Sequence, residues 1–86
     1  MFLNFSRSIN VNGTLFVNGG WDDSKKMALK YHLSFDSSSW KIVEEPEMLY
    51  GHSAHSLIYV PPNYIYVVSG SGIGKCEKYD INSKVW

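Results

Sequence analysis

The chain has 86 residues, of which 44% are hydrophobic and 15% aromatic, so its length suits one small domain. Eight basic and eight acidic residues give a formal net charge of zero, and no basic stripe appears, which disfavours nucleic acid or an anionic membrane as the main partner. The single cysteine, Cys76, excludes an internal disulfide and favours a reducing compartment. We expect it to be a small buried side chain.

The first residues, 1–5, are too short an apolar stretch for the core of a signal peptide, and no run approaches membrane-spanning length. If Met1 is the true start, we expect a cytoplasmic location, the cytoskeleton included.

The first predicted element is a β-hairpin. Asn12-Gly13 lies between the apolar-containing runs 8–11 and 14–17. Because Asn and Gly both accept positive φ angles, this pair predicts a type I′ turn between two antiparallel strands.

The second strand of this hairpin ends at Gly19-Gly20 and opens a pattern that continues with Phe35-Asp36 and Trp40. Residues 41–44 follow as a plausible outermost strand. Asp36 begins a Ser-rich segment, where a short acceptor side chain caps backbone amides, so we interpret it as a turn former.

A second copy of the pattern begins with strands at 53–60 and 64–69, separated by Pro61, Pro62 and Asn63. Residues 64–68 are apolar or aromatic at every position, which predicts a strand covered on both faces. Residues 57–60, and more weakly 15–17, suggest the same. The copy continues with Gly70, then Tyr79-Asp80, then Trp86.

The two copies repeat at a period of 44 to 50 residues. The offset is 50 between Gly20 and Gly70, 44 between the aromatic-Asp pairs, and 46 between the two Trp residues. Self-similarity of this length predicts a repeat architecture, and short antiparallel strands at this spacing suit the four-stranded blades of a β-propeller. The equal spacing of Trp40 and Trp86 predicts that both pack between neighbouring blades.

These anchors resemble those of a kelch repeat, in which a hydrophobic strand ends in a glycine pair and is followed by a Tyr-Asp-like pair and a Trp. The resemblance covers almost the whole chain. Its anchors in this sequence are Gly19, Gly20, Phe35, Trp40, Gly70, Tyr79 and Trp86. Phe35 replaces the usual Tyr, Ser69 replaces the first glycine of the second pair, and Tyr50 stands where the linker of kelch proteins often has Arg.

The resemblance implies an all-β fold of antiparallel four-stranded blades. We expect an N-terminal lead-in at 1–7, a first blade at 8–45, an inter-blade linker at 46–53, and a second blade at 54–86 that lacks its outer strand. Closed propellers have roughly four to eight blades, so we expect a fragment of a larger ring. A ring built from several short chains, or a degenerate packing of two blades, is the alternative.

Several residues resemble active-site motifs, but their context favours structural roles. The glycine-rich run 70–75 has the wrong spacing for a phosphate-binding loop, and no helical pattern follows it. His52 and His55 would point to opposite faces of a strand, which disfavours a metal pair, and one of them should face solvent. The acidic segment 44–47 is interpreted as a solvated loop. We therefore predict no catalytic residue, no metal site and no cofactor.

Trp21 is the best candidate for contact with a partner. It lies in the longer loop of the first copy beside Asp22, Asp23, Lys25 and Lys26, and the second copy has Ser71 at its position. An exposed Trp among charged residues is typical of protein interfaces, although it could instead fold back over the strand ends.

The function that the resemblance implies is a non-enzymatic protein-protein interaction or scaffold module. Its partners would be other proteins that bind the blade loops, and further blades in the same or another chain. Two alternatives stay open. One is a fragment of a propeller enzyme similar to a copper-radical oxidase, for which Cys76, Tyr79 and three histidines are present without a supporting spacing. The other is a piece of a substrate receptor of a ubiquitin ligase.

Overall fold

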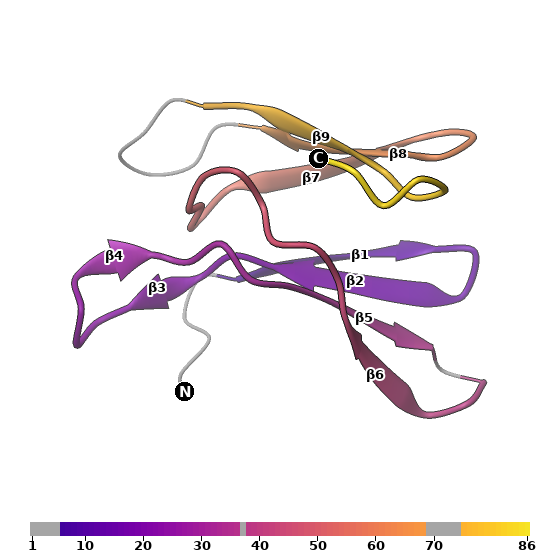
Figure 1. Ribbon diagram of the computed structural model, residues 1–86, viewed down its shortest axis with the longest axis horizontal. Coiled ribbons are helices and arrows are strands. Elements are labelled where there is room, and N and C mark those ends of the chain that lie inside the picture. Colours follow the sequence, from indigo (N-terminus) through magenta and orange to yellow (C-terminus); the bar gives the residue numbers. More distant parts are fainter. Residues whose placement is uncertain (1–5, 37, 69–74) are drawn as a thin grey trace.

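The computed structural model describes residues 6–36, 38–68 and 75–86. These residues form nine β-strands and no helix, and every strand pairing is antiparallel, so the predicted all-β class is confirmed (Figure 1). The strands are β1 (Arg7–Val11), β2 (Thr14–Asn18), β3 (Trp21–Asp22), β4 (Met27–Ala28), β5 (His32–Asp36), β6 (Lys41–Glu44), β7 (Ser56–Val60), β8 (Tyr64–Val68) and β9 (Glu77–Asp80).

The first sheet has four strands in the order β1-β2-β5-β6. Val11 pairs with Thr14, so a loop of two residues joins β1 to β2. The φ angles of Asn12 and Gly13 are 52° and 91°, and a type I′ turn requires both to be positive. The Asn10 side chain also accepts a hydrogen bond from the Gly13 N–H at 3.1 Å. The predicted hairpin is therefore confirmed.

The second sheet has three strands in the order β7-β8-β9. The predicted turn at 61–63 joins β7 to β8, and the Tyr59 hydroxyl donates to the Pro62 carbonyl across it at 2.8 Å. After β9 the chain turns back, and Val85 forms an isolated bridge with Asp80. This bridge occupies the place that β6 takes in the first sheet.

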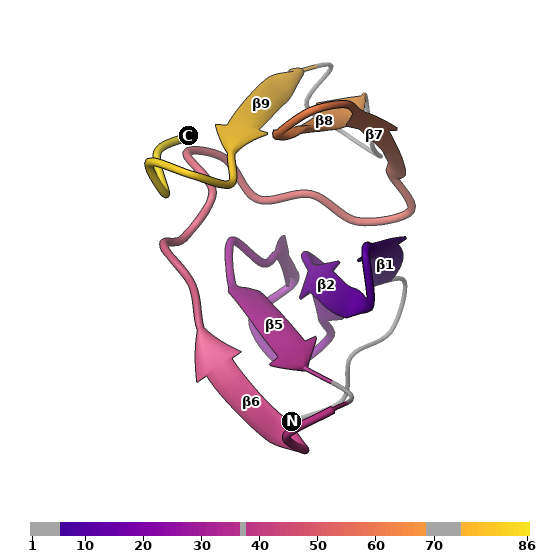
Figure 2. The ribbon, with the colours of Figure 1, turned by 90° about the vertical axis from the view of Figure 1, so that its right-hand side faces the viewer.

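The two sheets stack face to face, with β1 in contact with β7 (Figure 2). We call the face of each sheet that meets the other sheet its inner face, and the opposite face its outer face. Phe16 on β2 lies 5% exposed in the buried core between them, while Ile65 on β8 and Tyr79 on β9 are fully buried. Removing such side chains from water is the main favourable contribution to stacking, at roughly 25 cal/mol per Å² of apolar surface.

Among the described residues the outer faces are open, so the predicted cover of the apolar strands is present on the inner side, and cover of the outer side stays a prediction. Burial alternates along β7 and β8, so that the paired residues Ile58 and Tyr66 are 50% and 36% exposed, whereas Ile65, next to Tyr66 on β8, is buried. Side chains alternate between the two faces of a strand, and among the described residues only the inner face has a second layer over it.

The turns after β5 and β9 share a left-handed residue and a backbone hydrogen bond, and these features correct the predicted equivalence of Trp40 and Trp86. Trp40 and Lys84 both have a φ of 58°, and their N–H groups donate to the carbonyls of Asp36 and Asp80, each at 2.8 Å. The true counterpart of Trp40 is therefore Lys84. Because the offset of 44 residues continues through the turn, the counterpart of Trp86 is Ile42.

Trp40 is 82% exposed, so the prediction that it packs in the core is wrong for this structure. Its ring contacts only one other aromatic ring among the described residues, that of Phe35, edge to face at 6.0 Å between centroids. Trp86, in contrast, packs on Tyr79 and His32 at 4.7 and 5.0 Å.

The linker 45–55 crosses from the first sheet to the second and is held by its backbone. The N–H groups of Met48 and His52 donate to the carbonyls of Lys30 and Leu29 at 2.9 and 3.1 Å. Gly19, at a φ of 72°, passes so close that a Cβ would collide with the His52 carbonyl and the His55 ring. This close approach explains why the residue directly after β2 is a glycine.

Candidate functional site

The predicted partner residues gather on one projection of the molecule, the hairpin of β3 and β4. Trp21 pairs with Ala28 and Asp22 with Met27, and this two-stranded sheet extends away from the first sheet (Figure 1). Trp21 is half-buried, while Asp23, Lys25 and Lys26 are exposed. The structure therefore brings all five predicted residues together at one tip.

The charges of this tip are largely satisfied within it. Asp22 Oδ1 accepts hydrogen bonds from the Ser24 hydroxyl and N–H at 2.7 and 3.0 Å and from the Lys25 N–H at 3.2 Å. The Ser24 hydroxyl is the main reason that the pKa of Asp22 lies below its usual range. Lys26 and Asp23 form an exposed ion pair at 3.3 Å. The tip thus presents a half-buried Trp21 with two acidic and two basic residues around it.

His52 and His55 lie side by side, which corrects the prediction that they diverge. Their ring centroids are 5.6 Å apart, and both residues are at least 98% buried. The segment is bent rather than extended, and Ala54 takes a left-handed φ of 51°, so the alternation of a strand does not apply. No group of three or more His, Cys, Asp or Glu among the described residues could hold a metal ion.

A buried carboxylate, Glu77, fixes the linker to the second sheet, and the sequence alone did not indicate it. Its Oε1 accepts from the Leu49 N–H at 2.7 Å, and its Oε2 accepts from the Tyr50 N–H at 3.0 Å and from His52 Nε2 at 2.6 Å. The His52 and Glu77 side chains are 0% and 2% exposed. Because each of these bonds joins Glu77 on β9 to the linker, the side chain ties the linker to the second sheet.

His55, on the linker, forms a second buried pair with Asn18 on β2. Its Nε2 donates to Asn18 Oδ1 at 2.7 Å, and both residues are buried. Burial lowers the pKa of His55 to about 4, and the nearby His52 and Arg7 act in the same direction. The neutral imidazole is therefore the form that the fold accommodates.

Glu45 joins the two sheets by a second polar contact, so the prediction that segment 44–47 is entirely a solvated loop is wrong at this residue. Its side chain, 5% exposed, accepts from the Ser34 and Tyr79 hydroxyls at 2.8 Å each, and Lys84 Nζ lies 3.6 Å away. Burial alone would raise the pKa of Glu45, but these hydrogen bonds hold it below its usual value. Burial together with the bond to Glu45 raises the pKa of Tyr79.

The Pro46 carbonyl is shared by two ring donors beside Glu45. His32 Nδ1 lies 3.2 Å from it, and Trp86 Nε1 donates to it at 2.7 Å. The His32 pKa is lowered, chiefly by burial. Polar groups from both sheets and the linker therefore meet at one end of the interface, where they set the register of stacking.

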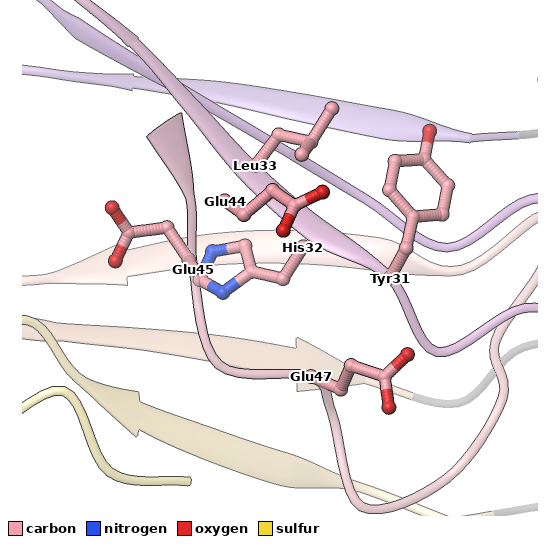
Figure 3. A pocket seen from close by; sticks show the side chains of 6 residues that line it. All are labelled: Tyr31, His32, Leu33, Glu44, Glu45 and Glu47. Atoms are coloured by element: carbon pink, nitrogen blue, oxygen red, sulfur yellow. The ribbon is translucent and has the colours of Figure 1, made fainter. Parts of the chain in front are cut away.

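Two shallow hollows lie on the surface, and neither has the form of a catalytic cleft. The first, of about 230 Å³, is lined by Tyr31, His32, Leu33, Glu44, Glu45 and Glu47. In Figure 3 the carboxylate of Glu45 points away from those of Glu44 and Glu47, so the three acids do not converge. The second, of about 200 Å³, lies beside Tyr64, Lys78 and Trp86. Pockets for small ligands are usually larger, at roughly 300 to 1,000 Å³.

The remaining predicted residues are distributed over both sheets. Cys76 is exposed, which corrects its predicted burial, while Tyr79 is buried with its hydroxyl on Glu45. Asp36 and Asp80 accept hydrogen bonds from backbone amides two residues on, each at 3.0 Å, so both are turn formers as predicted. Gly70 and most of the glycine-rich run lie outside the described residues.

Within the described part of the chain, no helix has the length and apolarity needed to cross a bilayer. Comparison of the chain with protein-family models and with curated proteins gave no match. The kelch resemblance therefore stays a prediction that depends on the anchor residues.

Proposed function

We propose that the chain is a non-catalytic protein-protein interaction or scaffold module, and that its two sheets are consecutive units of a kelch-type β-propeller in a larger assembly. One observation carries the proposal. Two antiparallel sheets of corresponding register stack face to face, and each leaves an apolar outer face open. A stacked unit that cannot cover both of its own faces is typical of repeat architectures.

The surface proposed to bind another protein is the β3–β4 tip. It projects from the stacked sheets, it holds a half-buried Trp21, and hydrogen bonds and one ion pair order its charged residues. The bonds that Asp22 accepts from the Ser24 and Lys25 N–H groups order the turn of the tip, which reduces the entropy lost on binding. Trp is also the residue most often found at energetic hot spots of interfaces.

Site-specific photo-crosslinking in cells tests this proposal. A photoreactive amino acid replaces Trp21 in one variant and Lys41 in a matched control. Lys41 is exposed and begins β6, a strand that lies at the opposite end of the molecule from β3 and β4 (Figure 1). We expect one recurrent protein adduct from position 21 that is absent from position 41. Equal adduct patterns from both positions, or no protein adduct from position 21, would rule out the tip as the binding surface.

A further inference from the structure

The outer face of each sheet carries the counterparts of residues that are buried on the inner face of the other sheet. In the first sheet Val11 closes the turn opposite Thr14, and in the second sheet Val60 closes it opposite Tyr64. This alignment makes the cross-strand pair Ile9–Phe16 equivalent to Ile58–Tyr66. The first pair packs in the core, whereas the second lies exposed.

The same correspondence holds in the other direction. Leu15 pairs with Phe35 on the outer face of the first sheet, and Ile65 pairs with Tyr79 on the inner face of the second. Continuing through the equivalent turns, Ile42 corresponds to Trp86. Ile42 is 70% exposed, while Trp86 packs against the first sheet. The contact between the sheets thus uses two different surfaces, and the chain displays a second, unused copy of each.

We propose that the outer face of the second sheet binds the outer face of the first sheet in a second copy of the chain, repeating the stacking seen within one chain. This inference shares with the proposed function the idea of a repeated stacked unit, but it does not depend on the β3–β4 tip. Because the two surfaces differ, the contact is heterologous, so each bound copy leaves one open face for the next copy.

The exposed side chains of the two faces favour this occupant. Ile58, Val60 and Tyr66 are between 36% and 50% exposed on one face, and Trp40 and Ile42 are 82% and 70% exposed on the other. Contiguous exposed apolar surface of this kind marks an interaction site. The outer face of the second sheet carries Lys78 and Asp80 and that of the first carries Glu44, so a Lys78–Glu44 attraction is available, and a net charge of zero removes the overall repulsion between copies.

Sedimentation velocity of the full chain over a range of concentrations, with two blocking variants, tests the inference. Ile58→Glu blocks the outer face of the second sheet, and Ile42→Glu blocks that of the first. Since a buried unpaired charge is costly, each variant alone should lose self-association by about tenfold or more. An equimolar mixture should form a one-to-one dimer that does not grow, because each partner still offers the one face that the other needs.

Leu49→Glu is the matched control, because Leu49 is 60% exposed on the linker and belongs to neither sheet. It should associate like the parent chain. Far-UV circular dichroism checks folding, and Tyr66→Lys with Trp40→Lys forms a second blocking pair if either Glu variant fails to fold. A parent chain that stays monomeric at every concentration overturns the inference, and so does a variant that still self-associates or a mixture that forms no dimer. None of these results bears on crosslinking at position 21, so the two proposals fail separately.

Discussion

The two sheets share strand order and turn geometry, yet their aromatic residues have opposite surroundings. In the second sheet Tyr79 and Trp86 pack on His32 across the interface. In the first sheet the counterparts Phe35 and Ile42 lie on an outer face that no second sheet covers among the described residues. The turns after β5 and β9 are alike, yet the residues that flank them differ in burial. Burial in this molecule therefore depends on which sheets are adjacent and not on the local motif.

The largest expected change in stability comes from a comparison of substitutions on the two faces of the second sheet. Ile65→Ala should lower the free energy of unfolding by about 2–5 kcal/mol, because Ile65 is fully buried between the sheets. Ile58→Ala removes the same atoms from the outer face and should cost less than about 1 kcal/mol in the monomer. Urea denaturation at low protein concentration measures both. Equal losses would show that the outer face is as well packed as the inner one.

The two Trp residues sharpen the comparison between the turns. Trp86→Ala removes packing on Tyr79 and a hydrogen bond to the Pro46 carbonyl, so we expect a loss of about 2–3 kcal/mol. Trp40→Ala should change stability by less than about 1 kcal/mol because Trp40 is 82% exposed. Thermal unfolding of the two variants measures both losses. A larger loss for Trp40→Ala than for Trp86→Ala would show that Trp40 packs in the core.

Glu77→Gln tests whether the buried carboxylate holds the linker. The amide keeps the shape of the side chain but replaces one acceptor oxygen with an NH₂ donor. This donor then faces an N–H group from which Glu77 accepts a hydrogen bond in the parent chain. We expect a loss of about 1–3 kcal/mol. Glu44→Gln, on an exposed side chain, is the control and should change nothing measurable. A Glu77 variant as stable as this control contradicts the assigned role.

The last prediction is a pH dependence of stability that comes from His55. Its pKa is about 4 in the fold and 6.5 in an ordinary setting, so the unfolded chain takes up a proton that the folded chain resists. Stability is therefore fully present above about pH 6.5 and falls as the pH is lowered toward 4. The lowered pKa of Glu45 adds a further loss at more acidic pH. Urea denaturation at several pH values should give a shallower decline for His55→Gln, and an unchanged decline would exclude His55 as its source.

Local signals in the sequence predicted the local features of the fold. Asn12-Gly13 predicted the hairpin, and Asp36 and Asp80 predicted the turns, because each works through backbone groups a few residues away. The prediction of two covered faces is met on the inner face alone, because an apolar strand pattern reports the capacity for burial and not the presence of a neighbour. The equivalence of Trp40 and Trp86 was wrong because it matched residue type, whereas the turn preserves spacing.

The polar contacts could not be predicted from sequence at all. Glu77 accepts from Leu49 and Tyr50, which lie 28 and 27 residues away along the chain. Tyr79 donates to Glu45 over 34 residues. No local pattern marks such pairs, since they exist only once the sheets have stacked. The β3–β4 tip could be predicted from local sequence, because its five residues are consecutive or nearly so and share one hairpin.

The central claim is that the two sheets stabilise each other through their inner faces. A double-mutant cycle between Phe16 on β2 and Tyr79 on β9, whose ring centroids lie 6.4 Å apart, tests it most directly. Unfolding of the chains with Phe16→Leu, Tyr79→Leu and both changes should give a coupling of about 0.5–1.5 kcal/mol. Strictly additive losses would contradict the stacking of the two sheets.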